Sequence, residues 1–358
     1  MTVQGAYGYE LTQVGAPLHL AELPALEPGA DEVIVKVAAC GVCHTDVGFA
    51  FDGVPTRHEL PLVLGHEITG YVVAAGEQAQ RWQGQAVIVP AVIACGKCQA
   101  CKAGRPTICR KQFMPGNDGN GGYASHVRVP ARGLCAVPQP LPAGVSLEAL
   151  SVVADAVTTP FEAIRRSGLK AGEVAVIVGA GGIGGFGVQI AAAVGAKVIA
   201  IDVDNERLEL AQQHGASLTL NPHRCDEKEL RRDVRGFAGQ FGAPGSTLKI
   251  FEMSGTADGQ WTAFNLLDFG AYLAIVGYTP KKIEVRLSNL MAFDATAQGN
   301  WGCPAEQYPN ALELVLAGKI AIEPFIERHL LEEVPEIMKG VAGHAFRRRV
   351  VLVPNGHD

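Results

Sequence analysis

Short apolar runs separated by turn residues characterise the first 155 positions of the chain. Valine, isoleucine and other strand-forming residues gather at 33–37, 68–73 and 86–89, and turns containing glycine bound these runs. Runs of this length and composition predict strands. Few long helical patterns occur in this half, so we expect it to be β-rich.

The pattern changes after Pro140, and from about residue 156 strand-like and helix-like segments alternate. The expected strands and helices of this region are 173–178, 181–194, 197–202, 205–214, 248–251 and 272–276, and a helix at 308–316 and a strand at 349–353 follow. Strands that alternate with helices predict a parallel sheet covered on both faces. The fold class is therefore α/β, with a β-rich domain followed by a doubly wound parallel-sheet domain.

Composition and charge exclude several classes of protein. The 358 residues are 48% hydrophobic and 18% charged, which is typical of a globular chain of two domains. A net charge of −6 argues against nucleic acid as a partner. The uncharged stretch 174–196 is long enough to cross a membrane, but glycines interrupt it and its pattern is that of a buried strand, turn and helix. The chain start has no secretory signal, so we predict a cytoplasmic protein with no membrane partner.

A glycine-rich turn joins the expected strand at 173–178 to the helix after it. Its sequence is Gly179-Ala180-Gly181-Gly182-Ile183-Gly184. Gly179 permits the tight turn, Gly181 lets a pyrophosphate approach, and Gly184 lets helix and strand pack closely. Asp202 ends the next strand, where a carboxylate binds the adenosine ribose and disfavours a 2′-phosphate. This context predicts that the turn binds NAD. The alternative is a glycine-rich turn that binds no ligand.

Six of the nine cysteines lie in two clusters, which indicates metal binding in a reducing compartment. The larger cluster is Cys95, Cys98, Cys101 and Cys109. Four thiolates within fifteen residues can enclose one Zn²⁺ with no open position, which is a structural site. An iron–sulfur cluster is the alternative, but the Cys-Pro ending of bacterial ferredoxin runs is missing, since Arg110 follows Cys109.

Two further motifs, Cys40-Gly41-Val42-Cys43-His44-Thr45-Asp46 and Gly65-His66-Glu67, lie in the β-rich half. With the four-cysteine segment and the glycine turn, in that order, they make the chain resemble the zinc-dependent medium-chain alcohol dehydrogenases over essentially its whole length. The resemblance implies a GroES-like catalytic domain at 1–155, a structural zinc lobe at about 94–112, an NAD-binding Rossmann domain at 156–300 and a C-terminal return to the catalytic domain at 301–358.

The resemblance also implies a catalytic zinc site. Cys43 and His66 would be zinc ligands, and Asp46 would hold the imidazole of His66. The family often has a cysteine as third ligand, where this chain has Asp155. A carboxylate oxygen is acceptable to zinc, so we expect Asp155 to complete the shell, with Glu67 as a possible alternate ligand. We expect this zinc to be held less tightly than the structural one, which gives two zinc ions per chain.

Further roles follow from the same resemblance. Thr45 would take the proton of the alcohol, and the histidine that usually continues the proton path is Gly48 here. The cofactor contacts carried over are His44 and Arg349 to the pyrophosphate, Arg207 near the adenosine ribose, and Thr159, Ile183, Val276 and Gly277 around the nicotinamide.

Three segments narrow the substrate class by resemblance. Residues 114–126, 152–160 and 288–294 with 299–303 are similar to a branch of the family that oxidises a cyclic CoA thioester, with Trp301 as a candidate pocket residue. The alternatives are a general NAD-dependent zinc dehydrogenase of a small secondary or benzylic alcohol and a non-catalytic relative that binds zinc and dinucleotide. Relatives form homodimers or homotetramers, so we expect one of these.

Overall fold

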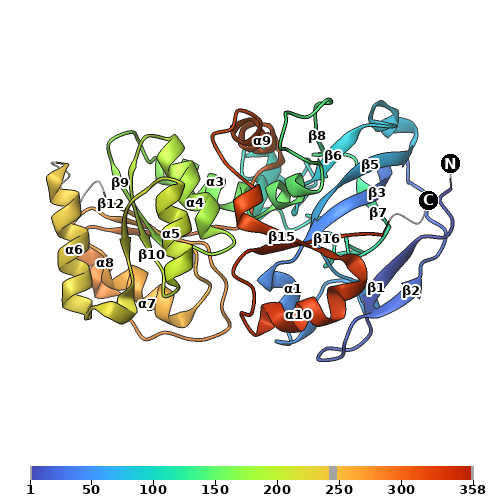
Figure 1. Ribbon diagram of the computed structural model, residues 1–358. Helices are drawn as coiled ribbons and strands as arrows, with labels where there is room; N and C mark the ends of the chain where they lie inside the picture. Colours follow the sequence, from blue (N-terminus) through green and yellow to red (C-terminus); the bar gives the residue numbers. More distant parts are fainter. Residues whose placement is uncertain (1, 242–247, 356–358) are drawn as a thin grey trace. The chain divides into compact units, whose positions relative to one another are not determined.

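The computed structural model describes residues 2–241 and 248–355, and the chain forms two compact units (Figure 1). Unit 1 comprises Met1–Thr158, Gly302–Leu316 and Ile322–Asp358, and unit 2 comprises Thr159–Trp301 and Ala317–Ala321. Each unit has a hydrophobic core of its own, built around a sheet. Within the described part of the chain, no helix has the length and apolar character needed to cross a bilayer.

Unit 1 is built on a mostly antiparallel sheet. Among the described residues this sheet has seven strands, namely β15 (Ile326–Leu330), β16 (Arg349–Val353), β3 (Glu32–Gly41), β5 (Glu67–Ala75), β6 (Ala86–Val89) and β8 (Cys135–Ala136) in spatial order, with β7 (His126–Pro130) paired to β3. A smaller sheet contains β2 (His19–Glu22), β1 (Tyr7–Leu11) and β4 (Leu62–Val63). The expected strands at 33–37, 68–73 and 86–89 fall within β3, β5 and β6 and are confirmed.

Short helices fill the connections of unit 1, and two of the candidate ligands, Cys43 and Asp155, flank helices α1 and η3. They are η1 (Glu77–Trp82), η2 (Pro106–Ile108), η3 (Ala149–Ala154), η6 (Ala305–Gln307), η7 (Glu323–Phe325), η8 (Leu331–Glu333), α1 (His44–Ala50), α2 (Gln99–Lys102), α9 (Tyr308–Leu316) and α10 (Val334–Ala342). The predicted helix at 308–316 is α9, and the predicted last strand at 349–353 is β16. Every residue of η3 is buried, which fixes the segment immediately before Asp155.

Unit 2 holds the predicted parallel sheet. Its strand order among the described residues is β11 (Ala216–Leu220), β10 (Lys197–Ile201), β9 (Val174–Val178), β12 (Leu248–Glu252), β13 (Tyr272–Ile275) and β14 (Thr296–Gly299), and every neighbouring pair is parallel. The helices between them are α3 (Thr158–Ser167), α4 (Gly184–Ala193), α5 (Asn205–Gln213), η4 (Pro222–Arg224), α6 (Glu227–Gln240), α7 (Ala257–Asn265) and α8 (Ser288–Ala292). Chain order reverses direction at β9, which gives the doubly wound topology.

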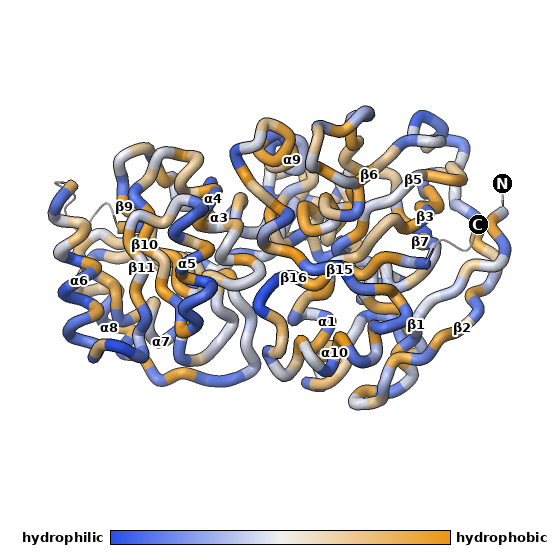
Figure 2. Tube along the Cα trace, in the orientation of Figure 1, coloured by the Kyte–Doolittle hydropathy of each residue, from blue (hydrophilic) through white to orange (hydrophobic). Residues whose placement is uncertain are grey.

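The burial of unit 2 explains why these segments fold as they do. All five residues of β9 are buried, as expected for a central strand covered on both faces. Helix α6 buries only Leu230, Val234 and Ala238, which are spaced four apart on one face, and leaves its charged residues exposed or half-buried. Figure 2 shows this contrast as apolar colour along β9 and β10 and polar colour along much of α6.

Candidate active site

The start of helix α1 places the first candidate ligand. Strand β3 ends at Gly41, and Cys43 is the N-cap residue of α1. The backbone N–H of Cys43 donates to Oδ2 of Asp46 at 3.1 Å, so a first-turn carboxylate holds this turn. The Sγ atom of Cys43 lies 3.6 Å from the hydroxyl oxygen of Thr45 in the same turn.

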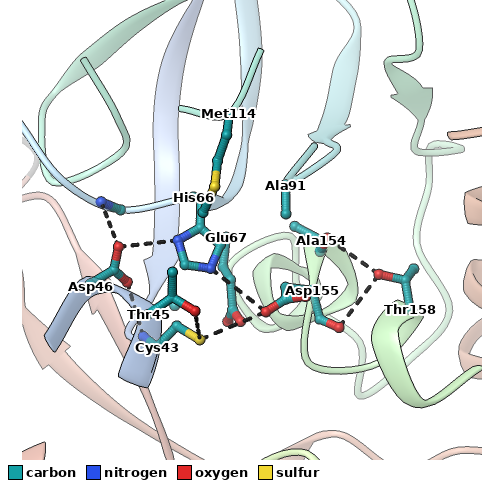
Figure 3. Close-up of polar contacts among 12 residues, drawn as sticks. Cys43, Thr45, Asp46, His66, Glu67, Ala91, Met114, Ala154, Asp155 and Thr158 are labelled. Carbon is teal, nitrogen blue, oxygen red and sulfur yellow. Dashed lines mark hydrogen bonds and ion pairs between the residues drawn. The ribbon is translucent and has the colours of Figure 1, made fainter. Parts of the chain in front are cut away.

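Asp46 is fully buried and orients His66. Its Oδ1 accepts from Nδ1 of His66 at 3.1 Å (Figure 3). Its Oδ2 accepts from the hydroxyl of Tyr123 at 2.9 Å. Burial alone would raise the pKa of Asp46, but the facing His66 and these donors lower it below its ordinary value. Bonding Nδ1 to a carboxylate leaves Nε2 of His66 directed to the other candidate ligands, as is usual for a metal-binding histidine.

Four candidate metal donors, of which Nε2 of His66 is one, converge at a single point of unit 1. One donor atom each from Cys43, His66, Glu67 and Asp155 lies within 4.8 Å of the others (Figure 3). Oδ2 of Asp155 is 3.6 Å from Nε2 of His66 and 3.8 Å from Sγ of Cys43. Zinc bonds of about 2.0–2.3 Å to tetrahedrally placed donors separate neighbouring donors by roughly 3.3–3.8 Å. The set of one thiol, one imidazole and carboxylate oxygens therefore fits Zn²⁺.

Glu67 forms a buried ion pair with Arg349 in the same place. Nε of Arg349 donates to Oε2 of Glu67 at 3.2 Å, and a second nitrogen pairs with Oε1. Burial raises the pKa of Glu67 to about 7 against the opposing effect of Arg349. Both oxygens of the Glu67 carboxylate are therefore paired with Arg349, although the carboxylate lies beside the other candidate donors. The expected roles of Glu67 as an alternate ligand and of Arg349 at a pyrophosphate stay predictions.

The predicted proton path lacks the histidine side chain that the family usually has at position 48. Gly48 is buried within α1 and offers no side chain. The ring of His44, one turn earlier, stacks on the ring of His344 with 5.1 Å between centroids. No motif in the sequence predicted a role for His344 or Tyr123 at the site. Tertiary packing brings each of these side chains into contact with it from a distant segment.

The four-cysteine segment forms a compact group in unit 1. Sγ of Cys98 lies 3.5 Å from Sγ of Cys101 and 3.6 Å from Sγ of Cys109, and Sγ of Cys95 lies 4.0 Å from that of Cys101. Four sulfurs around one Zn²⁺ at about 2.3 Å are roughly 3.8 Å apart, so the group fits a tetrahedral site. The backbone N–H of Lys97 lowers the pKa of Cys95 to about 6, which favours the thiolate.

We expect Cys98→Ser to remove the zinc of this group alone. Elemental analysis of the purified variant should give one zinc per chain where the parent gives two, and the melting temperature should fall because the segment 95–109 loses the ion that ties it together. Cys225→Ser is the matched control, since Cys225 belongs to neither donor group. Two zinc ions retained in Cys98→Ser would contradict the assignment.

The glycine turn of unit 2 has the geometry of a dinucleotide loop. Gly179 has a φ of +90°, which side-chain-bearing residues rarely adopt, and a Cβ on it would lie 2.5 Å from Cα of Ser254. A Cβ on Gly184 would lie 1.6 Å from the carbonyl oxygen of Gly179. Asp202 accepts the N–H of Ala180 at 2.7 Å, so its carboxylate lies directly against this turn.

The other predicted cofactor residues of unit 2 lie around the same strand ends. The guanidinium of Arg207 is 3.4 Å from the position a Cβ on Gly181 would take, and Ile183 is the N-cap of α4. Val276 and Gly277 follow β13, and both backbone N–H groups donate to the carbonyl of Glu252. The helix expected at 181–194 begins at Gly184, because Gly182 and its neighbours form the turn. Thr159 is buried in α3, and Trp301 is half-exposed.

Comparison with known proteins agrees with this architecture. Residues 29–139 match the family described as "Alcohol dehydrogenase GroES-like domain", and residues 182–317 match "Zinc-binding dehydrogenase". An alcohol dehydrogenase of Geobacillus stearothermophilus is 30% identical, over 92% of this chain and 93% of its own length.

Solved structures give the same result. An alcohol dehydrogenase of Aeropyrum pernix has a TM-score of 0.86 at 27% identity, over 97% of this chain and 100% of that one. A zinc-binding dehydrogenase of Sinorhizobium meliloti bound to NADP has a TM-score of 0.85 at 29% identity, over 98% and 99%.

The chain belongs to the zinc-dependent medium-chain alcohol dehydrogenases. It is therefore an oxidoreductase of the NAD(P)-dependent zinc alcohol dehydrogenase type, with a GroES-like domain and a Rossmann-like domain. The predicted family and fold class are confirmed.

Proposed function

We propose that this enzyme oxidises the ring alcohol of 6-hydroxycyclohex-1-ene-1-carbonyl-CoA to the 6-oxo enone with NAD, as a cytoplasmic homodimer or homotetramer in anaerobic benzoyl-CoA degradation. The observation that carries the dehydrogenase chemistry is the convergence of Cys43, His66 and Asp155 at one point of unit 1. The substrate class rests on the resemblance of residues 114–126, 152–160 and 288–294 with 299–303 to the branch of the family that acts on this thioester.

The chain supplies the groups that this oxidation needs. Zinc held by Cys43, His66 and Asp155 would supply Lewis acidity that lowers the pKa of the substrate hydroxyl, and nicotinamide would accept the hydride. The Thr45 hydroxyl, 3.6 Å from Sγ of Cys43, is a group beside the donors that can relay the hydroxyl proton, accepting it as it passes its own proton to water. Asp46 keeps His66 in the tautomer that directs Nε2 to the site.

Asp202 supports NAD as the cofactor. Its Oδ1 accepts the N–H of Asp204 at 2.9 Å and its Oδ2 accepts the N–H of Ala180, so two backbone groups fix the carboxylate. A fixed negative charge at the end of β10 repels a 2′-phosphate and accepts hydrogen bonds from ribose hydroxyls. The Arg207 guanidinium near Gly181 is the nearby positive group that a 2′-phosphate would meet, so a direct comparison of cofactors is needed.

Steady-state rates with the purified zinc enzyme test the proposal. We expect kcat/KM for the cyclic hydroxyenoyl-CoA to exceed those for cyclohexanol and benzyl alcohol by at least about 100-fold, because binding energy from the CoA portion contributes to the transition state. NAD should be preferred to NADP by at least about tenfold.

Each of the other outcomes of this assay would support one of the alternative functions. Equal rates with the free alcohols would make the enzyme a general dehydrogenase of small secondary or benzylic alcohols. Zinc and NADH binding without turnover of any alcohol would indicate a non-catalytic relative. Incubation of the 6-oxo product with the enzyme also tests for water or hydride addition to the conjugated alkene.

A further inference from the structure

The segment that presents Asp155 is irregular and needs support from outside itself. Asp155 follows η3 with φ −144° and ψ −57°, so the helical hydrogen-bond pattern stops there. A helix end leaves carbonyl oxygens without partners inside the helix. The carbonyl of Ala154, directly before Asp155, is one of these, and its partners come from other segments of the chain.

A tyrosine from a distant helix provides the shortest of those partners. The hydroxyl of Tyr308, at the start of α9, donates to the carbonyl oxygen of Ala154 at 2.6 Å. The same hydroxyl accepts the N–H of Ala91, after β6, at 3.1 Å. One buried oxygen atom therefore connects three segments of unit 1 at the residue next to the candidate third ligand.

The other contacts to this carbonyl are longer. The hydroxyl of Thr158 lies 3.3 Å from the Ala154 oxygen, and the N–H of Ala91 lies 3.4 Å from it (Figure 3 shows the Thr158 contact). Tyr308 is only 1% exposed. Burial raises the pKa of Tyr308 well above its ordinary value, so the hydroxyl keeps its proton and remains a donor.

We propose that Tyr308 is a positioning residue for the catalytic metal: it holds the Ala154 carbonyl and thereby sets where the Asp155 carboxylate meets Cys43 and His66. This inference rests on the proposed function, because it takes Asp155 to be a zinc ligand. The Tyr308 hydroxyl contacts the backbone at Ala154 and Ala91, so the effect acts through the backbone. Tyr308 touches neither substrate nor cofactor in this role.

Tyr308→Phe tests the proposal, because it removes one oxygen atom and keeps the ring. We expect the variant to lose zinc from the Asp155 site to dipicolinate about ten times faster or more, which is the range seen for groups that orient metal ligands. The zinc of the four-cysteine group should stay. The cobalt-substituted variant should show an altered visible spectrum, because one donor of the metal has moved.

Tyr7→Phe is the matched control. The Tyr7 hydroxyl is buried in unit 1 and has no hydrogen-bond partner within the described residues, so its removal deletes the same atom without touching Ala154. Zinc release and the cobalt spectrum should be unchanged in this control. A lower melting temperature in Tyr308→Phe with the parent's zinc-release rate and spectrum would overturn the proposal, because that is the result of a purely structural role.

A double variant separates this proposal from the function on which it rests. Asp155→Ala is expected to be purified without this zinc, so the double variant is compared with it by titration with added zinc; Tyr308→Phe should not weaken zinc binding further in that background, since residues that act through one another are not additive. Independent, additive effects would overturn the positioning role. If Asp155→Ala alone releases no zinc faster than the parent, the ligand assignment fails and the inference fails with it; if only Tyr308→Phe has no effect, the ligand assignment stands.

Thr158→Val keeps the proposal testable should Tyr308→Phe fail to fold. It removes the longer hydroxyl contact to the same carbonyl, together with a 3.5 Å contact of that hydroxyl to the carbonyl of Asp155, and keeps the Tyr308 side chain. We expect zinc release from the Asp155 site to accelerate in the same direction but less. An unchanged release rate in this variant, with Tyr308→Phe unfolded, would overturn the proposal.

Discussion

Asp155→Ala should remove the catalytic zinc and with it nearly all alcohol oxidation. The carboxylate is one of three donors that we assign to the ion, and its Oδ2 lies 3.6 Å from Nε2 of His66. Two remaining protein ligands are fewer than the three that catalytic zinc sites keep. We expect one zinc per chain by elemental analysis and a fall in kcat/KM of at least about 10³-fold, since the Lewis acid that activates the alcohol is lost.

Asp155→Cys is the informative counterpart of that variant. It supplies the thiolate that the resemblance implies at this position in many relatives, and softer ligands hold zinc more firmly. We expect the variant to retain two zinc ions under a dipicolinate concentration that strips the parent. Two zinc ions in Asp155→Ala, under conditions in which the Cys98→Ser variant has lost one, would show that Asp155 is not a ligand. Glu67, whose carboxylate lies in the same group of donors, would then be the residue to replace.

The difference between Asp155 and the four cysteines shows what the sequence alone could predict. Cys95 to Cys109 lie within fifteen residues, so their spacing limits where the sulfurs can go and indicates one metal. Asp155 lies 112 residues from Cys43, and no spacing rule connects them. Only the resemblance to a family placed it among the ligands. The structure brings its carboxylate to the candidate site through the buried turn after η3.

Side chains that support the site were beyond prediction for a related reason. Tyr308 reaches Ala91 across 217 residues, and Arg349 reaches Glu67 across 282. A tyrosine at the start of a helix has the pattern of an ordinary core residue, and an arginine in a basic run near the chain end has the pattern of a solvated surface. The buried ion pair and the shared hydroxyl arise from tertiary packing. By contrast, β9 and β16 were predictable because their apolar runs, of five and four residues, indicate their own burial.

Gly184→Ala should abolish cofactor binding while leaving the metal sites intact. A methyl group at this position would lie 1.6 Å from the carbonyl oxygen of Gly179 and 2.7 Å from its carbonyl carbon, so backbone must move. Because the clash joins the two ends of the proposed phosphate-binding turn, the N–H groups at the start of α4 lose their common orientation. We expect the NADH dissociation constant, measured by fluorescence, to rise at least about 100-fold, with roughly 3 kcal/mol or more of lost stability.

Gly236→Ala is the control that makes this expectation specific. Gly236 lies inside α6 of the same unit, and nothing is within 4 Å of where its Cβ would be. The substitution should stabilise the protein by about 0.5–1 kcal/mol and leave NADH binding unchanged. Both variants should retain two zinc ions per chain, because all the candidate ligands belong to unit 1, which has its own core. Parent-like NADH affinity in Gly184→Ala would mean that the cofactor phosphates are bound elsewhere than at this turn.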